Sequence, residues 1–191
     1  MLSNRSKLVL GSASPRRREL LERAGYSVDV APGDVDEEVR AGERAHEYLA
    51  RIVDAKLAAV RQRAPLNAVL VVADTSVLRE DEILGKPRDL DHAATMLRSL
   101  AGRTHLVVTR FAVARGERVI ASSVSTEVEF RAIGNDEVSA YLATGEGVDK
   151  AGGYAIQGVA AMFVRRVVGS YTNVVGLPLC EVVEAVRALD G

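Results

Sequence analysis

The chain is poor in cysteine, lysine and long apolar runs. Cys180 is the single cysteine among 191 residues, so an internal disulfide cannot form. The stability of the fold therefore does not depend on an oxidising compartment. No apolar run approaches the roughly 20 residues that cross a bilayer, and the N-terminus lacks the apolar core of a signal peptide. We therefore expect a cytoplasmic protein that does not enter a membrane.

The chain also lacks a surplus of charge of either sign. Its 25 basic and 26 acidic residues give a formal net charge of -1. A sequence-independent grip on a phosphate backbone needs excess Lys and Arg, so broad nucleic-acid binding is not expected. Binding of one small anion stays open, because a few clustered basic side chains suffice for it.

Several familiar catalytic patterns are missing as well. The three histidines, His46, His92 and His105, are dispersed and lack the spacing of a metal site. Neither the GxxxxGK[ST] phosphate loop nor the G-x-S-x-G elbow occurs, which argues against a P-loop kinase or GTPase and against acyl-transfer hydrolysis.

Strand and helix patterns alternate along the chain, which is typical of a mixed α/β protein. We expect strands near residues 7–11, 26–31, 68–73 and 162–168, with a hairpin formed by 104–114 and 119–131. Helices are expected near residues 15–24, 43–63, 91–100, 135–142 and 178–189. No repeat or linker divides the chain, so residues 1–191 are read as a single domain.

A first candidate site lies where the first expected strand gives way to a helix. Ser12 and Ser14 place hydroxyls at the N-terminus of this helix, with Ser14 as the expected N-cap, and Arg16 and Arg17 add guanidinium groups. Unpaired helix N–H groups beside such side chains suit a phosphate or pyrophosphate. The alternative is a capped helix whose arginines are solvated.

Carboxylates supply a second and a third candidate. Asp74 and Thr75 follow the apolar run 68–73, where a carboxylate could hold a divalent metal, accept a proton from water or merely cap a turn. Glu37 lies in an acidic loop that is either solvated or the outer wall of a metal site.

The chain contains few lysines, and their positions are informative. The four lysines are Lys7, Lys56, Lys86 and Lys150, and three of them fall in or beside candidate segments. Arginine fills the surface role elsewhere, so these lysines could serve as compact charges against phosphate.

Six short motifs occur in one order along the chain: Ser12-Ala-Ser-Pro-Arg-Arg17, Ala73-Asp-Thr75, Gly85-Lys-Pro-Arg-Asp89, Gly102-Arg-Thr-His105, Asp149-Lys-Ala-Gly-Gly-Tyr-Ala-Ile-Gln-Gly158, and Gly169-Ser-Tyr with Val175-Gly-Leu-Pro178. From about Leu8 to Val186 the chain closely resembles the Maf family of nucleoside triphosphate pyrophosphatases. The resemblance implies a Maf/inosine-triphosphatase-like α/β fold, a mixed sheet with flanking helices and two lobes around a central cleft.

The resemblance also implies an activity. Members cleave between the α- and β-phosphates with a divalent cation, Mg²⁺ or Mn²⁺, and release a nucleoside monophosphate and pyrophosphate. They are cytoplasmic and often homodimeric. A second hypothesis is a nucleotide-binding regulator of cell division or septum formation, a role also attached to the family. A third is a broader house-cleaning activity on damaged bases.

Roles for individual residues follow from the same resemblance. The position matching Asp74 is the proton acceptor, and those matching Arg16, Thr75 and Gln157 are linked to substrate choice. The residues that line the same site match Ser12, Arg17, Glu37, Lys56 and Lys86. Ser14 and Lys150 join them as expected phosphate contacts, and Glu37 and Asp74 are the expected metal ligands.

Gln157 allows an argument about the base. Its amide offers both a donor and an acceptor, which matches the uracil or thymine edge, whereas a Glu there would only accept and would suit guanine. In the family, Gln paired with Thr75 goes with dTTP and UTP rather than methylated GTP. We therefore expect a dTTP/UTP pyrophosphatase.

Overall fold

The structure is a computed structural model that describes residues 7–190. Its strands are β1 (Lys7–Leu10), β2 (Ser27–Val30), β3 (Val69–Arg79), β4 (Glu82–Leu84), β5 (Thr104–Arg115), β6 (Arg118–Phe130) and β7 (Val164–Val168). Its α-helices are α1 (Pro15–Arg23), α2 (Ala45–Arg61), α3 (Leu90–Leu100), α4 (Asn135–Ala143), α5 (Tyr171–Val175) and α6 (Leu179–Asp190), with 3-10 turns η1 (Ala151–Gly153) and η2 (Val159–Phe163). Within this range no helix is long and apolar enough to span a membrane.

The strands form one mixed seven-stranded sheet. Their order is β2-β1-β3-β5-β6-β7, and β4 pairs with β3. The pairs β1–β2 and β1–β3 are parallel, whereas β3–β4 and β6–β7 are antiparallel. The expected mixed α/β architecture is confirmed.

The chain divides into two compact units. The first contains the residues up to Asp74, Thr109–Val124 and the segment from Gly176 onward, and the second contains Thr75–Val108 and Ser125–Val175. The strands β3, β5 and β6 contribute to both.

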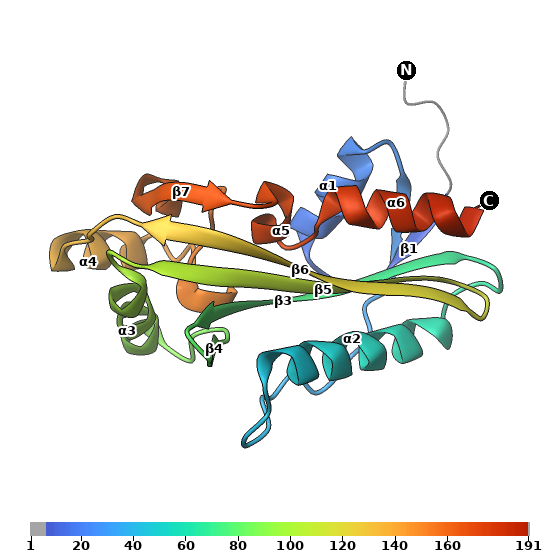
Figure 1. Ribbon diagram of the computed structural model, residues 1–191, viewed down its shortest axis with the longest axis horizontal. Helices are drawn as coiled ribbons and strands as arrows, with labels where there is room; N and C mark the ends of the chain where they lie inside the picture. The colour runs from blue at the N-terminus through green and yellow to red at the C-terminus, as the bar shows by residue number, and fades with distance from the viewer. Residues whose placement is uncertain (1–6, 191) are drawn as a thin grey trace. The chain divides into compact units, whose positions relative to one another are not determined.

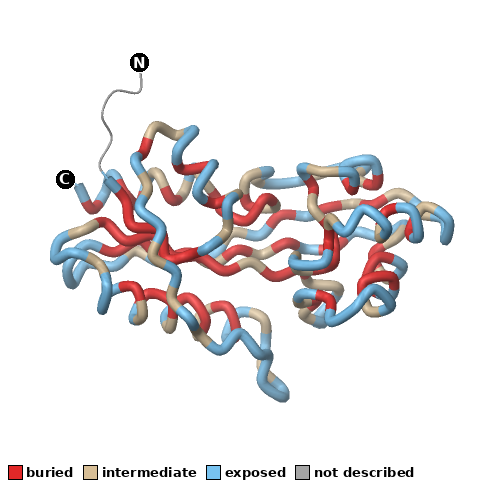
Figure 2. The backbone as a smooth tube through the Cα atoms, turned by 180° about the vertical axis from the view of Figure 1, so that it is seen from behind, coloured by how far each residue is buried: buried red, intermediate tan, exposed pale blue. Residues whose placement is uncertain are grey.

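The first unit has helices on both faces of its sheet. Figure 1 shows α2 on one face and α1 and α6 on the other. Side chains of α2, among them Val53 and Val60, pack with Val9, Leu70 and Val72 of the strands. Figure 2 shows the buried residues running along these strands and the inward face of α2. Alternation along a strand explains why Leu70 and Val72 share this face.

Aromatic rings form the core of the second unit. The rings of His105, Phe130 and Tyr154 meet edge to face with centroids 4.9–5.5 Å apart. His105 Nε2 and the Tyr154 hydroxyl lie 2.8 Å apart in a hydrogen bond. Burial lowers the pKa of His105 from 6.5 to about 4, so this imidazole is neutral at neutral pH.

One expected boundary is wrong. The strand near residues 68–73 continues to Arg79, so Asp74 and Thr75 lie inside β3 rather than at its C-terminal end. The apolar run stops at Ala73, but Val77, Leu78 and Arg79 pair with β4 and extend the strand.

The pKa of His105 makes stability depend on pH. Between pH 6.5 and about 4, His105 is protonated in the unfolded chain but neutral in the folded chain. The free energy of unfolding should therefore fall as pH drops through this interval. A His105→Gln variant should show a shallower fall in urea unfolding across the same pH range. Exposed His46 supplies the control, because His46→Gln should leave the wild-type slope intact. An unchanged slope in His105→Gln would contradict the assignment.

Candidate functional site

A buried lysine lies between two carboxylates in the first unit. Lys56 is 6% exposed, and its Nζ lies 2.6 Å from Oδ1 of Asp74 and 2.6 Å from Oε1 of Glu37. Asp74 is buried as well, whereas the Glu37 side chain is 38% exposed. The three side chains predicted from separate segments therefore meet at one point.

Two periodicities bring Lys56 and Asp74 together. Lys56 occupies a position in the apolar stripe of α2, beside Val53 and Val60, so its side chain is directed at the sheet. Asp74 follows Leu70 and Val72 at two-residue steps and therefore lies on the face that α2 covers. A lysine inside an apolar stripe was a sequence signal of a buried charge.

The backbone around Glu37 is held by two side chains of α2. The Tyr48 hydroxyl donates to the carbonyl of Glu37 at 3.1 Å. Arg51 donates to the carbonyl of Asp36 at 3.4 Å and to that of Glu38 at 2.8 Å. Three consecutive carbonyls are thus tied to one helix. Sequence reasoning missed both donors, although a tyrosine beside the apolar stripe usually needs a partner for its hydroxyl.

An ion pair completes this attachment. Arg51 Nε and Nη2 each lie 2.7 Å from an oxygen of Glu43, a bidentate arrangement, and the guanidinium also stacks 5.6 Å from the ring centroid of Tyr48. The hydrogen bond from Arg51 lowers the pKa of Glu43 to about 2. The pair therefore contributes its stability above pH 4.5 and loses it as pH falls toward 2.

The start of α1 is joined to the strand that carries Asp74. Arg17 is 8% exposed and donates to the Ser12 hydroxyl at 3.1 Å, to the carbonyl of Ala73 at 2.8 Å and to that of Gly176 at 2.7 Å. Burial lowers the pKa of Arg17, while the charge of Asp74 opposes this shift. Much of the Arg17 fork is thus engaged with the protein rather than left for a phosphate.

The two other predicted residues of this segment are less enclosed. Ser14 precedes α1 as expected, but its hydroxyl makes no cap hydrogen bond; its backbone N–H instead donates to the Ser12 hydroxyl at 3.2 Å. Ser14 and Arg16 are both half-buried, so both remain accessible to a ligand.

The remaining predicted residues belong to the second unit. Thr75 is half-buried in β3, where adjacent side chains leave opposite faces of the sheet, so it does not share the face of Asp74. Lys86 and Gln157 are exposed. Lys150 Nζ donates to the carbonyl of Glu146 at 2.7 Å and pairs with Asp149.

A backbone contact links two of the loops in this unit. The N–H of Gly152 donates to the carbonyl of Gly85 at 3.1 Å, which joins the loop of Lys150 to that of Lys86. Gly152 has a φ of +70°, and a Cβ there would lie 2.9 Å from Val77. Only glycine fits this crossing without strain.

The carboxylates of Glu37 and Asp74 suit a hard cation. Both already surround one ammonium at 2.6 Å, and carboxylate oxygen is the donor that Mg²⁺ and Mn²⁺ prefer. Among residues 7–190 no group of three or more His, Cys, Asp or Glu side chains is arranged around a metal. Two carboxylates fit a Mg²⁺ that takes its other ligands from phosphate and water.

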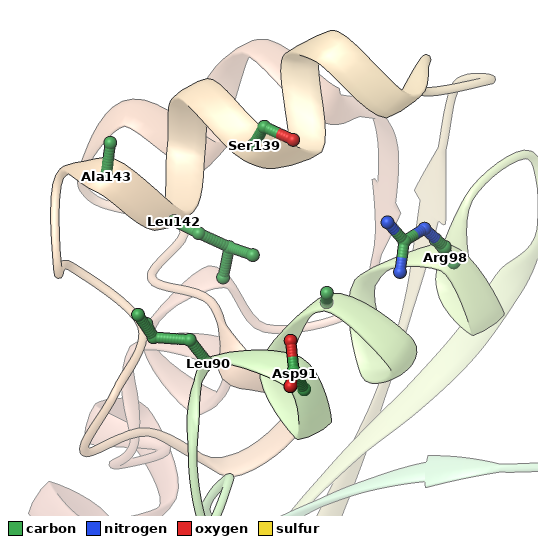
Figure 3. Close-up of a pocket in the computed structure, with 7 residues that line it drawn as sticks. Leu90, Asp91, Arg98, Ser139, Leu142 and Ala143 are labelled. Atoms are coloured by element: carbon green, nitrogen blue, oxygen red, sulfur yellow. The ribbon is translucent and has the colours of Figure 1, made fainter.

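A groove elsewhere in the second unit contains none of these residues. It lies between α3 and α4 and has a volume of about 390 Å³ (Figure 3). Its lining is formed by Leu90, Asp91, Ala94, Arg98, Ser139, Leu142 and Ala143. The lining has one acidic and one basic side chain and no cluster that resembles a catalytic site.

Comparison with known proteins gives matches over nearly the whole chain. Residues 7–189 match the family described as Maf-like protein. The chain is 48% identical to a dTTP/UTP pyrophosphatase of Geotalea uraniireducens, covering 99% of this chain and 98% of the relative. It is 49% identical to one of Cereibacter sphaeroides, covering 91% and 90%, and 43% identical to one of Methylococcus capsulatus, covering 96% and 91%.

Solved structures give a weaker likeness. A nucleoside-triphosphatase / dITP/XTP pyrophosphatase of Mycobacterium abscessus aligns with a TM-score of 0.42 at 16% identity, covering 65% of this chain and 72% of that one.

The attachment of the Glu37 loop can be tested through Arg51. An Arg51→Gln variant loses the pair with Glu43 and the bonds to two loop carbonyls, so the loop should open more often. We expect trypsin to cut after Arg40 and Arg44 at least about tenfold faster, the equivalent of roughly one lost hydrogen bond. Arg115→Gln, which removes the pair of Arg115 with Asp190, is the matched control. Equal cleavage of both variants would refute the role of Arg51.

Proposed function

The chain belongs to the family of Maf-like proteins, and we propose that it is a nucleoside triphosphate pyrophosphatase acting on dTTP and UTP. Relatives between 43% and 49% identical over nearly the whole chain carry the name dTTP/UTP pyrophosphatase. Such an enzyme adds water to the triphosphate and releases a nucleoside monophosphate and pyrophosphate. The observation that carries the proposal is the Lys56 ammonium held between Glu37 and Asp74.

Asp74 is the proposed proton acceptor. As the water oxygen bonds to phosphorus, its proton passes to the Asp74 carboxylate, and the bridging P–O bond breaks with pyrophosphate as the leaving group. A positioned base of this kind contributes about 10²–10⁴-fold to the rate. The hydrogen bond from Lys56, at 2.6 Å, orients the Asp74 carboxylate before substrate arrives.

Lys56 also offsets charge. A triphosphate is repelled by two carboxylates, and the ammonium beside Glu37 and Asp74 reduces this repulsion. A divalent cation held by the same two carboxylates would supply further positive charge to the phosphate oxygens.

The start of α1 is the proposed phosphate-binding segment. Ser12, Ser14 and Arg16 provide donors at a helix N-terminus, which attracts anions. Arg17 has a supporting part, because its bonds to Ser12 and to the carbonyl of Ala73 keep this segment in register with Asp74.

The second unit supplies the other proposed substrate contacts. Lys86 and Lys150 would bind phosphate, and Thr75 and Gln157 would act in substrate choice. Gln157 is exposed, and its amide complements the donor and acceptors of a uracil or thymine edge. We further propose that the whole chain functions as one domain, as a homodimer in the cytoplasm.

The activity is tested by measuring pyrophosphate release with Mg²⁺ or Mn²⁺. The wild-type protein should turn over UTP and dTTP faster than 7-methyl-GTP. Asp74→Asn should lower the rate by at least about 10²-fold, as expected for loss of a general base, while UTP still binds in calorimetry. Asp29→Asn, which alters an exposed partner of Lys7, should keep the wild-type rate.

Two results would overturn the proposal. Comparable turnover of 7-methyl-GTP and UTP would contradict the base choice. A wild-type protein that binds nucleotides without releasing pyrophosphate would instead be a nucleotide-binding regulator.

A further inference from the structure

Gln157 lies in a tight turn. The N–H of Gly158 donates to the carbonyl of Ala155 at 3.1 Å, which closes the turn around Ile156 and Gln157. Ile156 is only 8% exposed, whereas Gln157 is exposed. One side chain of the turn is therefore anchored in the protein and the next is free to meet a ligand.

Both flanks of this turn are hydrogen-bonded to the same pair of side chains. The N–H of Ala155 donates to the Tyr141 hydroxyl at 3.3 Å. The N–H groups of Val159 and Ala160 donate to the Glu146 carboxylate at 2.7 and 3.3 Å. Tyr141 in turn donates to Glu146 at 3.1 Å, which joins the two attachments.

The carboxylate of Glu146 also packs directly against the turn. A Cβ added to Gly158 would lie 2.0 Å from Oε2 of Glu146, so no larger residue fits while the carboxylate is in place. On the preceding side, the Tyr154 hydroxyl is hydrogen-bonded to buried His105. The turn thus has little freedom to move relative to the second unit.

We infer that Glu146 is a positioning residue that sets the base specificity of Gln157, with Tyr141 as its partner. The inference rests on the proposed function, in which Gln157 reads a pyrimidine edge. The Glu146 carboxylate accepts from two backbone N–H groups just after the turn and from Tyr141, and the Gln157 side chain stays exposed. A recognition group held in place before binding loses less conformational entropy when the base arrives.

The consequence is selective for the nucleotide that Gln157 matches. Loosening the turn raises the ordering cost of the hydrogen bonds to uracil. A guanine base presents two adjacent N–H donors, which a carboxylate would pair better than the Gln157 amide does, so GTP has less to lose. The ratio of kcat/KM for UTP to kcat/KM for GTP should therefore fall. The cause should be a higher KM for UTP rather than a lower kcat.

Glu146→Gln is the test variant, with Tyr141→Phe as a second one that keeps the ring. Gln has the size of Glu, but its NH₂ would face one of the N–H or O–H groups that donate to the Glu146 carboxylate. We expect kcat/KM for UTP to fall about tenfold, roughly the loss of one hydrogen bond, while kcat/KM for GTP stays constant. Amide exchange at Val159 and Ala160, measured without nucleotide, should accelerate by a similar factor.

A matched control lies on α4, the helix that carries Tyr141. Glu137 accepts from the N–H of Gly134 at 3.0 Å and pairs with Arg131 at 2.6 Å, and none of these residues belongs to the turn. Glu137→Gln should leave the ratio of UTP to GTP unchanged. In a Gln157→Ala background, Glu146→Gln should add nothing further to that ratio, because it acts through Gln157.

The outcomes separate the inference from the proposed function. If the protein turns over neither nucleotide, the proposed function fails, and the Kd values for UTP and GTP replace the kinetic ratio. Equal losses for both nucleotides, a full additional effect in the Gln157→Ala background, or unchanged exchange at Val159 and Ala160 would each overturn the role of Glu146.

Discussion

The pairing of one buried ammonium with two carboxylates is the constraint around which the first unit is organised. A charge removed from water costs several kcal/mol unless a partner compensates it. Lys56 meets this demand with Glu37 and Asp74, which come from a loop and from β3. Helix, loop and strand must therefore all be in place before the charge is satisfied, and their assembly also builds the candidate catalytic site.

Hydrogen bonds from side chains of other segments hold two of the loops that carry candidate contact residues. In the first unit, Arg51 of α2 donates to backbone carbonyls on either side of Glu37. In the second, Tyr141 of α4 and Glu146 just beyond it accept from backbone amides around Gln157. In the first unit side chains donate to backbone carbonyls, and in the second they accept from backbone N–H groups. Both arrangements fix the backbone from which the contact side chain projects. Within each unit, the contact side chain is therefore aligned before a ligand binds.

Much of the fold could be predicted from local pattern, because helix and strand periodicities are visible in short windows. The end of β3 could not, since the strand continues past Ala73 by pairing with β4. The contact of Lys56 with Asp74 depends on how α2 sits on the sheet, which spacing alone does not encode. Arg17 illustrates the same limit: its motif indicated a phosphate contact, yet the structure joins it to the carbonyls of Ala73 and Gly176.

Binding of Mn²⁺ in the absence of nucleotide tests the central claim most directly. If Glu37 and Asp74 hold a divalent cation while Lys56 offsets part of their charge, Lys56→Met should bind Mn²⁺ at least about tenfold more tightly in calorimetry, since the ammonium no longer repels the metal. Lys7→Met, which removes an exposed pair with Asp29, should bind like wild type. The same Mn²⁺ affinity in Lys56→Met and wild type would contradict the account.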